Sequence, residues 1–542
     1  MNIELVIKRI LLAATVGAGL VQAESVPMKG SRPNIIVVMT DDQGYGDLSS
    51  TGHPYIKTPH IDKLREQSTR FEDFHVSSSC APTRAAIMSG VHPFKVGVTH
   101  TIFHRERMAL DKKILPQVMG EAGYATGIFG KWHLGDEEPY QPHMRGFDES
   151  LIHGGGIAGS SGIRSNGSYK DMLIRHNGKF VQTHGFCTDV FFGQAMSWMK
   201  QQHEADKPFL ACIFPNAPHG PWSAPEDSKK LYDGIEDPTA ASKAGFFAMI
   251  SNIDDNMGLL MEKLDEWGMA DDTILIFMTD NGSVAGSVYN AGMKGGKTSV
   301  HEGGSRVPFF IRLPGKIAAG RDIDTLTRHF DLLPTFADLA GVDVDTLETD
   351  GRSLLPLLDD PGARWEKRLM FFHTGRWGNP ESKHEKHRRN PGADNNKFLS
   401  FAARDEQWRL TVNKGVDKDL ELYDIEKDPG QKTNLAKENP ETVSVMMEAY
   451  GAWWDECRPL MVNEDADITQ SGIRWPDYLK EQQKNGAVPD LFIPGVRTDV
   501  KVISMSNKGD GGDEAGEPED DSREELLKKR EERKKAKASE PE

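Results

Sequence analysis

The stretch "NIIVVMTDD", residues 34–42, joins a short apolar run to a threonine and two aspartates. The run is shorter than an ordinary helix and rich in β-branched residues, which is typical of a strand buried on both faces of a parallel sheet. Three later stretches have the same form: "ATGIFG" (125–130), "FLACIF" (209–214) and "TILIFM" (273–278). We therefore expect four central strands of one sheet.

Helical patterns separate these runs, and the clearest is "FFAMISNIDDNMGLLMEKLDEW" at 246–267. Alternating strands and helices predict an α/β fold with a large, mostly parallel sheet flanked by helices. Ligands bind at the carboxyl ends of the strands in such sheets. The polar residues that follow the four runs are thus expected to meet at one edge: Asp41 and Asp42, Lys131 and His133, His219, and Asp280 and Asn281.

The second part of the chain has a different pattern of predicted secondary structure. Three short stretches beyond residue 355, at 368–374, 407–413 and 420–425, look like strands of a smaller antiparallel sheet, and 440–456 looks like a helix. The last residues lack aromatic side chains and are dense in charge, which is typical of a disordered tail or a solvated helix. The predicted organisation is a catalytic α/β domain at 33–355, a smaller C-terminal subdomain at 356–505 and a charged tail at 506–542.

The N-terminus has the form of an export signal. Lys8 and Arg9 precede the apolar stretch 10–23, which is too short to span a bilayer and ends in small residues. We expect cleavage before Glu24, and the absence of a cysteine after that site argues against a lipid anchor. This predicts a signal peptide at 1–23 and an exported protein, periplasmic or secreted, without a stable membrane anchor; an uncleaved anchor is the alternative.

Composition excludes some classes of protein. The net charge of the 542 residues is −17, which disfavours nucleic acid as a partner. Four cysteines, at 80, 187, 212 and 457, are too few for a disulfide scaffold. The sequence does not indicate an oligomeric state.

Oxygen donors dominate the predicted strand ends. Asp41, Asp42, Asp280 and Asn281 suit a hard divalent cation, Ca²⁺ or Mg²⁺. A single aspartate pair is more often a helix cap or a turn, but two such groups at neighbouring strand ends favour a metal site.

Basic side chains accompany these donors. Lys131, His133, His219 and Lys297 are expected at the same edge, and Lys297 lies in the glycine-rich stretch 292–308. Cations that converge on a metal site are typical of a site for a tetrahedral oxyanion, either sulfate or phosphate.

Cys80 lies in "SSSCAPTRAAIMSG" (77–90), where Pro82 suits the first turn of a helix. The N–H groups there can stabilise a negative oxygen or sulfur, and Arg84 can share the helix face with Cys80. A plain thiolate is nevertheless an unusual partner for an oxygen-ligated cation, so an oxygen-based group in its place fits better.

The five residues Cys80-Ala81-Pro82-Thr83-Arg84 match cysteine-any-proline-serine/threonine-arginine, and the chain resembles the sulfatase family in this signature. The resemblance extends over roughly residues 33–460, through the stretches 33–48, 58–90, 123–135, 216–221, 278–282, 295–308, 331–341, 350–358 and 421–436.

The resemblance implies a set of roles. Asp41, Asp42, Asp280 and Asn281 would bind Ca²⁺, with Mg²⁺ possible, and Cys80 would complete the set once oxidised to formylglycine by a formylglycine-generating or sulfatase-maturating enzyme. The hydrated aldehyde would supply the attacking oxygen. The remaining implied roles are orientation of that group by Arg84, binding of sulfate oxygens by Lys131 and Lys297, collapse of the diol assisted by His133, and protonation of the leaving alcohol by His219.

Two departures from the family pattern concern the loops. "GKTS" (296–299) lacks a second glycine found in a common form of this motif, and a family sulfate-binding serine or histidine between residues 150 and 170 stays unassigned.

The function predicted from these residues is hydrolysis of sulfate esters, of a sulfated carbohydrate or an aryl sulfate, with specificity in the loops 99–108, 152–169 and 371–390. The basic run 383–389 could bind further sulfates of a polymer while Trp377 stacks on a sugar ring; a solvated loop is the alternative. Two other functions stay open, a phosphodiester or phosphonate monoester hydrolase of the same superfamily and a non-catalytic polyanion-binding protein.

Overall fold

The computed structural model describes residues 28–101, 106–156, 163–360, 362–375, 396–461 and 475–504, without the side chains of residues 164 and 165. The chain separates into two compact units, Met1–Met505 and Ser506–Glu542, and only the first contains described residues. The predicted signal peptide, the basic run at 383–389, Trp377 and the charged tail lie outside the described residues.

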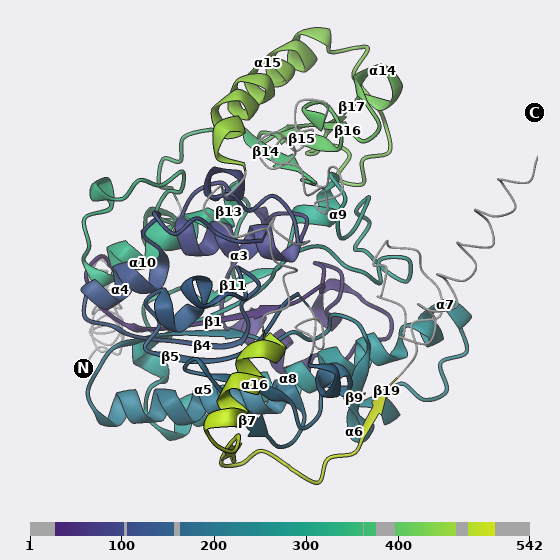
Figure 1. Ribbon diagram of the computed structural model, residues 1–542. Helices are drawn as coiled ribbons and strands as arrows, with labels where there is room; N and C mark the ends of the chain where they lie inside the picture. The colour runs from purple at the N-terminus through teal and green to yellow at the C-terminus, as the bar shows by residue number, and fades with distance from the viewer. Residues whose placement is uncertain are drawn as a thin grey trace, which may run out of the picture. The chain divides into compact units, whose positions relative to one another are not determined.

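The four apolar runs form the centre of the large sheet, as predicted (Figure 1). Its eleven strands have the order β12-β2-β11-β10-β1-β8-β4-β5-β6-β7-β18. The strands β10 (Thr273–Thr279), β1 (Asn34–Thr40), β8 (Phe209–Phe214), β4 (Ala125–Lys131) and β5 (Glu149–His153) are parallel. The remaining strands flank them: β11 (Phe309–Arg312), β2 (Thr69–Phe71), β12 (Arg321–Ile323), β6 (Leu173–His176), β7 (Lys179–Thr183) and β18 (Asp490–Leu491).

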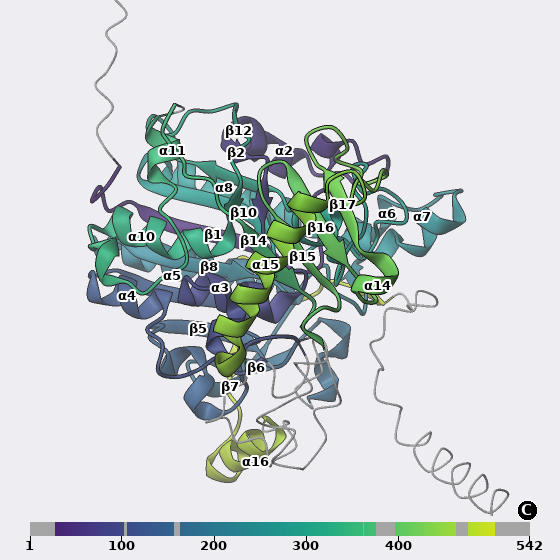
Figure 2. The same ribbon diagram turned by 90° about the horizontal axis from the view of Figure 1, so that it is seen from above.

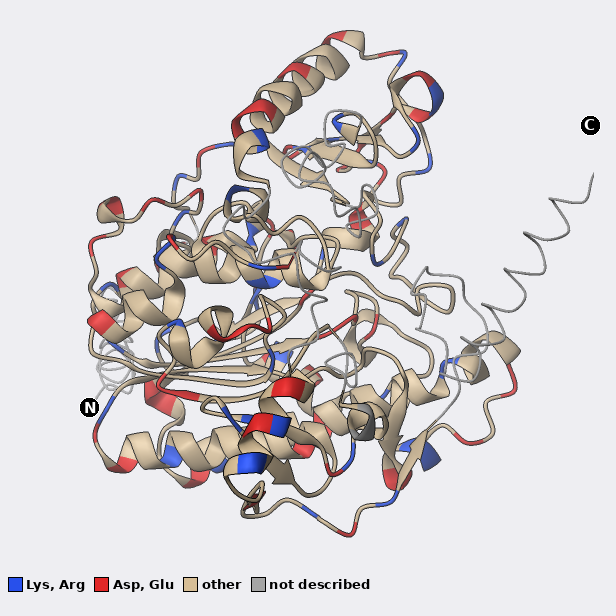
Figure 3. Ribbon diagram, in the orientation of Figure 1, with Lys and Arg blue, Asp and Glu red and all other residues tan. Residues whose placement is uncertain are grey.

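The sheet is covered on both faces, because alternate side chains of each strand enter different cores. Ile36 and Val38 pack with helices α5 (Cys187–Glu204) and α8 (Ala244–Glu266), whereas Ile35 and Val37 pack on the opposite face. That face is covered by α3 (Cys80–Ser89), α4 (Leu115–Glu121) and α10 (Leu332–Ala340). The predicted doubly covered α/β fold is confirmed, and the central strands are nearly free of charged residues (Figure 3).

A smaller antiparallel sheet follows, as the sequence predicted, with the order β14-β15-β16-β17. Its strands are β14 (Met370–His373), β15 (Phe401–Arg404), β16 (Trp408–Val412) and β17 (Glu421–Asp424). The predicted helix is α15 (Pro440–Cys457), which lies along this sheet in both views (Figure 1 and Figure 2). Its Tyr450 packs on Phe401 with the two rings stacked. The sequence analysis did not identify β15.

The segment 475–504 was expected in the smaller subdomain, but it runs along the large sheet. It contains α16 (Trp475–Asn485), β18, and β19 (Val502–Ser504). β18 pairs with β7, and β19 pairs with β9 (Ser223–Pro225). Trp475 explains this course, because its fully buried ring packs edge-on against Phe180 of β7.

Within the described residues, no helix is both long and apolar enough to cross a membrane.

Candidate active site

Two neighbouring strands bring the first acidic groups together. β1 and β10 are parallel and in register, with Thr40 opposite Thr279, so Asp41 and Asp280 leave the sheet side by side. Asp42 follows with a left-handed backbone, and its N–H donates to Asp280 Oδ1 at 3.1 Å. Asn281 Nδ2 donates to Asp42 Oδ1 at 3.1 Å. We call Asp41, Asp42, Asp280 and Asn281 the acidic pocket.

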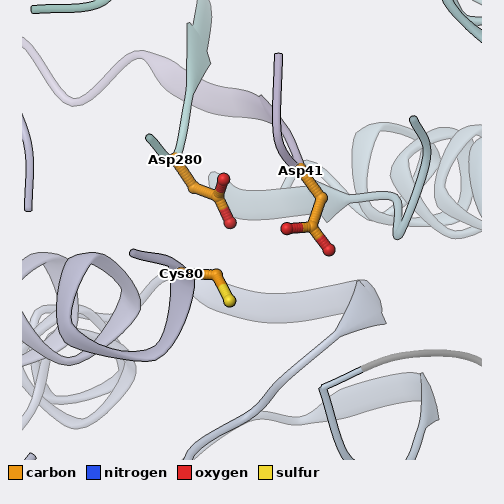
Figure 4. Close-up of side chains that lie close together, drawn as sticks. All are labelled: Asp41, Cys80 and Asp280. Carbon is orange, nitrogen blue, oxygen red and sulfur yellow. The ribbon is translucent and has the colours of Figure 1, made fainter. Parts of the chain in front are cut away.

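Cys80 faces this pocket from the first position of α3. Figure 4 shows the side chain of Cys80 close to those of Asp41 and Asp280, and the candidate ligand atoms of the three residues lie within 4.8 Å of one another. Burial raises the pKa of the Cys80 thiol to about 12, although the positive charge of Lys131 opposes this shift. The group at this position is therefore a protonated thiol rather than a thiolate at neutral pH.

Each carboxylate of the acidic pocket has a basic partner. Lys131 Nζ lies 2.6 Å from Asp41 Oδ2, Lys297 Nζ lies 2.8 Å from Asp42 Oδ2, and Arg84 Nη2 lies 2.9 Å from Asp280 Oδ2. The helix α3 thus carries both Cys80 and the arginine four residues later, as the helical spacing predicted.

These pairs do not compensate the carboxylates equally. Burial and the nearby Asp41 raise the pKa of Asp280 to about 7, despite Arg84 and Lys131. Burial also opposes the charge of Asp42, but His219 and Lys297 hold its pKa well below the usual range. Burial disfavours the charged form of Lys131, and Asp41 more than offsets it, so the pKa of that lysine is raised. Of Asp42 and Asp280, Asp280 is therefore the carboxylate whose burial is less well compensated by its basic partners.

The donor set fits a hard divalent cation. Asp41 Oδ1 and Asn281 Oδ1 are buried and have no hydrogen-bond partner among the described residues. Two unpartnered buried oxygens are costly unless something else binds them. Since the pocket offers carboxylate and amide oxygens, Ca²⁺ or Mg²⁺ matches its chemistry.

Two histidines complete the set of predicted residues. Burial, with Lys131 and Arg84 nearby, lowers the pKa of His133 far below its usual value, so the ring is neutral. Its Nε2 donates to Thr101 O at 3.2 Å, which leaves the Nδ1 lone pair facing Cys80 Sγ at 3.5 Å. His219 Nε2 lies 3.3 Å from Lys297 Nζ and 3.4 Å from Asp42 Oδ2. All the predicted site residues therefore gather at one sheet edge.

The sequence analysis missed His153. This residue ends β5, pairs in register with Lys131 and is buried, and its Nε2 has no hydrogen-bond partner in the described part of the chain. It lies in the interval where a serine or histidine stayed unassigned. The signal was present in "ESLIH" (149–153), a fifth short run that ends in a polar residue, as the other four do.

A second buried charge cluster lies beside the loop that carries Lys297. Glu302 Oε1 accepts hydrogen bonds from Arg409 Nη1 at 2.6 Å and Arg404 Nε at 3.2 Å. Both arginines belong to the small sheet, and Arg409 Nε also donates to Val300 O at 2.9 Å. We call Glu302, Arg404 and Arg409 the arginine brace, because it joins the Lys297 loop to the small sheet.

Comparisons with known proteins agree with this site. Residues 33–342 match the family model described as Sulfatase, and residues 296–450 match that of the N-sulphoglucosamine sulphohydrolase C-terminal region. The chain is 29% identical to arylsulfatase A of Bos taurus over 451 residues, covering 77% of this chain and 86% of that protein. It is 29% identical to N-acetylgalactosamine-6-sulfatase of Canis lupus familiaris over 369 residues, covering 63% and 69%.

A solved structure supports the same assignment. The crystal structure of Ps i-CgsB in complex with k-i-k-neocarrahexaose aligns with a TM-score of 0.67 and 28% identity, covering 84% of this chain and 99% of that one. The Sulfatase model alone matches more than half of the chain. The chain thus belongs to the sulfatase family and is a sulfuric ester hydrolase.

Proposed function

We propose that this protein is an exported sulfatase that removes sulfate from carbohydrates, using formylglycine made from Cys80 and a divalent cation in the acidic pocket. The observation that carries the proposal is the position of Cys80, whose sulfur lies among the carboxylates of Asp41 and Asp280. A buried, protonated thiol there is a poor nucleophile and a poor ligand for a hard cation. An oxygen at the same place suits both purposes.

Cys80 Sγ marks the place of that oxygen. Formylglycine at this position supplies, as its hydrate, an oxygen nucleophile that can attack sulfur and later release sulfate. Arg84 is fixed for orienting this group, because its Nη1 donates to Lys131 O at 2.7 Å while its Nη2 binds Asp280.

The acidic pocket would hold Ca²⁺ through Asp41, Asp42, Asp280 and Asn281. When bound, the cation supplies positive charge for the sulfate oxygens and favours an ionised nucleophile. The two unpartnered oxygens of Asp41 and Asn281 support this choice of ligands.

Lys131 and Lys297 would hold the oxygens of the sulfate group. Each makes its ion pair through a single terminal nitrogen on a long side chain. A lysine can therefore exchange a carboxylate for a sulfate oxygen by a rotation of its side chain, once a cation compensates the carboxylate. Their charge would offset the negative charge that grows on the equatorial oxygens during displacement.

The two histidines would transfer protons at the two ends of the reaction, one at the nucleophile and the other at the leaving group. His133 presents a free Nδ1 lone pair to the position of Cys80 Sγ, where it could accept a proton from the nucleophilic group. His219 lies beside Lys297 and Asp42 and would donate its Nε2 proton to the oxygen of the leaving alcohol.

A carbohydrate substrate is supported by the relatives rather than by the pocket itself. Their names include N-acetylgalactosamine-6-sulfatase, and Ps i-CgsB has been crystallised with k-i-k-neocarrahexaose. Export is supported by the charged and apolar pattern of residues 1–23.

The proposal is tested by producing the full chain together with a maturating enzyme. The peptide 71–84 should carry an aldehyde in place of the thiol, and the protein should cleave 4-nitrophenyl sulfate far faster than 4-nitrophenyl phosphate. A panel of sulfated oligosaccharides then identifies the sugar. A fully active preparation with an intact Cys80 thiol would exclude the formylglycine mechanism, and preferential cleavage of the phosphate ester would exclude the assigned substrate class.

A further inference from the structure

His219 lies in a connection that lacks regular secondary structure. The connection runs from the end of β8 at Phe214 to the start of β9 at Ser223. The ring is oriented by a local contact, because His219 Nδ1 lies 2.7 Å from the carbonyl oxygen of Gly220. A carbonyl can only accept, so Nδ1 carries the hydrogen and Nε2 is the nitrogen that faces Lys297 and Asp42.

Tyr169 holds this part of the connection. Its hydroxyl lies 3.0 Å from the carbonyl oxygen of His219 and 3.0 Å from that of Gly220. The side chain is completely buried. The oxygen of Gly220 thus lies within hydrogen-bond distance of two donors, the His219 ring and the Tyr169 hydroxyl, as its two lone pairs allow.

The position of Tyr169 is itself fixed. Its N–H donates to Asn166 O at 3.1 Å, and its carbonyl accepts the N–H of Cys187, the first residue of α5, at 2.8 Å. The side chain of Asn166 in turn makes two hydrogen bonds of 2.8 Å with the backbone of Leu173 in β6. The hydroxyl is therefore anchored to the large sheet and to α5, independently of the connection that it contacts.

From this arrangement we propose that Tyr169 is a positioning residue for His219, fixing the peptide of Gly220 so that its oxygen holds the Nδ1–H and directs Nε2 toward the leaving group. The inference rests on the proposed role of His219. In this step the His219 ring is protonated on both nitrogens. As the S–O bond of the ester breaks, its electron pair goes to the alcohol oxygen, the Nε2–H bond breaks and a new O–H bond forms, and the ring becomes neutral while keeping its Nδ1–H toward Gly220. A ring that rotates out of this direction cannot transfer the proton.

The effect of Tyr169 should depend on the leaving group. Nitrophenolate leaves without protonation, whereas an unactivated phenol or a sugar hydroxyl needs a proton during bond cleavage. General acid catalysis contributes about 10²–10⁴-fold, and a ring that is only less well oriented forfeits part of this. We therefore expect Tyr169→Phe to lower kcat roughly 10- to 100-fold on phenyl sulfate and less than about 3-fold on 4-nitrophenyl sulfate.

Tyr124 supplies a matched control. Its hydroxyl is also buried and donates to a backbone carbonyl, Pro33 O, at 2.9 Å, where Arg32 lies over the ring. Tyr124→Phe removes the same atom from a similar environment that none of the proposed catalytic residues lines. The ratio of the two activities should stay at the wild-type value in this variant.

The experiment compares kcat of the matured wild type, Tyr169→Phe and Tyr124→Phe over a series of phenyl sulfates with leaving groups of rising basicity, together with crystal structures of the three proteins. A steeper dependence on leaving-group basicity in Tyr169→Phe alone, with a reoriented His219 ring, supports the proposal. An equal loss on all esters, an unchanged dependence, or a His219 ring in its original place would overturn it. A wild type that cleaves none of the sulfates would instead overturn the proposed function, and the ring orientation would still decide the role of Tyr169.

Discussion

The acidic pocket and the arginine brace contain the same kinds of groups, and we propose different roles for them. Both are buried, and each contributes to a triad whose ligand atoms lie close enough to hold a metal ion, Asp41–Cys80–Asp280 in one case and Asp73–His75–Glu302 in the other. Proximity of acidic groups does not separate them. What separates them is that Glu302 pairs with arginines, whereas two of the three carboxylates in the acidic pocket, Asp41 and Asp42, pair with lysines.

Arginine closes the brace. Burial opposes the charge of Glu302, but Arg409 and Arg404 hold its pKa well below the usual range, and Arg404 also pairs with Asp73 at 3.1 Å. A guanidinium offers several donors in one plane, and Arg409 uses them on a carboxylate and a backbone carbonyl together. Such a partner cannot be exchanged without breaking several hydrogen bonds.

Lysine leaves the acidic pocket open to exchange. Lys131 and Lys297 each hold a carboxylate through one ammonium group, and Asp280 keeps a raised pKa of about 7 because of burial and Asp41. Under the proposed function, a dication bound in the pocket would release these lysines to an oxyanion. The comparison teaches that a buried charge cluster can be assigned to chemistry or to structure from how its cations bind.

The largest effect is expected in the pocket itself. Cys80→Ala removes the source of the attacking oxygen, and loss of a nucleophile can lower kcat on the order of 10⁶-fold. The unfolding free energy should change by no more than about 1 kcal/mol, because only one buried atom is removed. Turnover of 4-nitrophenyl sulfate and urea unfolding measure the two quantities. A variant that keeps one hundredth of wild-type turnover would contradict the assignment of Cys80.

The next largest effect is expected in the arginine brace, as a loss in the free energy of unfolding. Arg409→Met leaves Glu302 with fewer partners in a buried site, and breaking such a pair costs about 3–5 kcal/mol. Urea unfolding at fixed Ca²⁺ should show this loss. Lys427→Met is the control, because Lys427 pairs with buried Asp424 in the same sheet but is itself exposed, so it should cost less than about 1 kcal/mol. Equal stability of the two variants would mean that the brace is not a structural support.

A smaller effect separates two lysines of one loop. Lys297→Met should lower kcat/KM for sulfate esters about 10²–10³-fold, as loss of one donor to a transition-state oxyanion does. Lys294→Met should change it less than about 3-fold, since Lys294 lies against Glu421 and Tyr423 of the small sheet. Steady-state kinetics on 4-nitrophenyl sulfate distinguish them. Similar losses in both variants would show that the loop acts as a unit and that Lys297 has no separate role.

Local sequence patterns were sufficient for the centre of the fold and for most of the site. A strand buried on both faces is a continuous apolar run, so β1, β4, β8 and β10 could be identified, and their parallel order placed the following polar residues at one edge. The short β15, "FAAR", could not be identified, because four residues carry too little pattern and its place depends on pairing with β14 and β16.

Contacts between residues far apart in the chain could not be predicted from local sequence patterns. Glu302 and Arg409 are separated by 107 residues, with Glu302 in the short helix α9 (Glu302–Ser305) and Arg409 in β16, so neither sequence neighbourhood indicates the pair. Tyr169 is equally inconspicuous, because its role depends on a carbonyl 51 residues away. The course of segment 475–504 follows from the burial of one tryptophan against β7, which no periodicity in that segment predicts.

The most direct test of the distinction between the two clusters is calorimetric titration of chelated protein with Ca²⁺ and, separately, with Mg²⁺. Asp280→Asn removes one carboxylate from the acidic pocket, and His75→Gln removes one candidate ligand from the triad beside the brace. We predict that the wild type and His75→Gln bind one of the two ions, the one with the higher affinity for the wild type, equally tightly. Asp280→Asn should lose this binding. Tight binding that survives in Asp280→Asn, or that disappears in His75→Gln, would contradict the account.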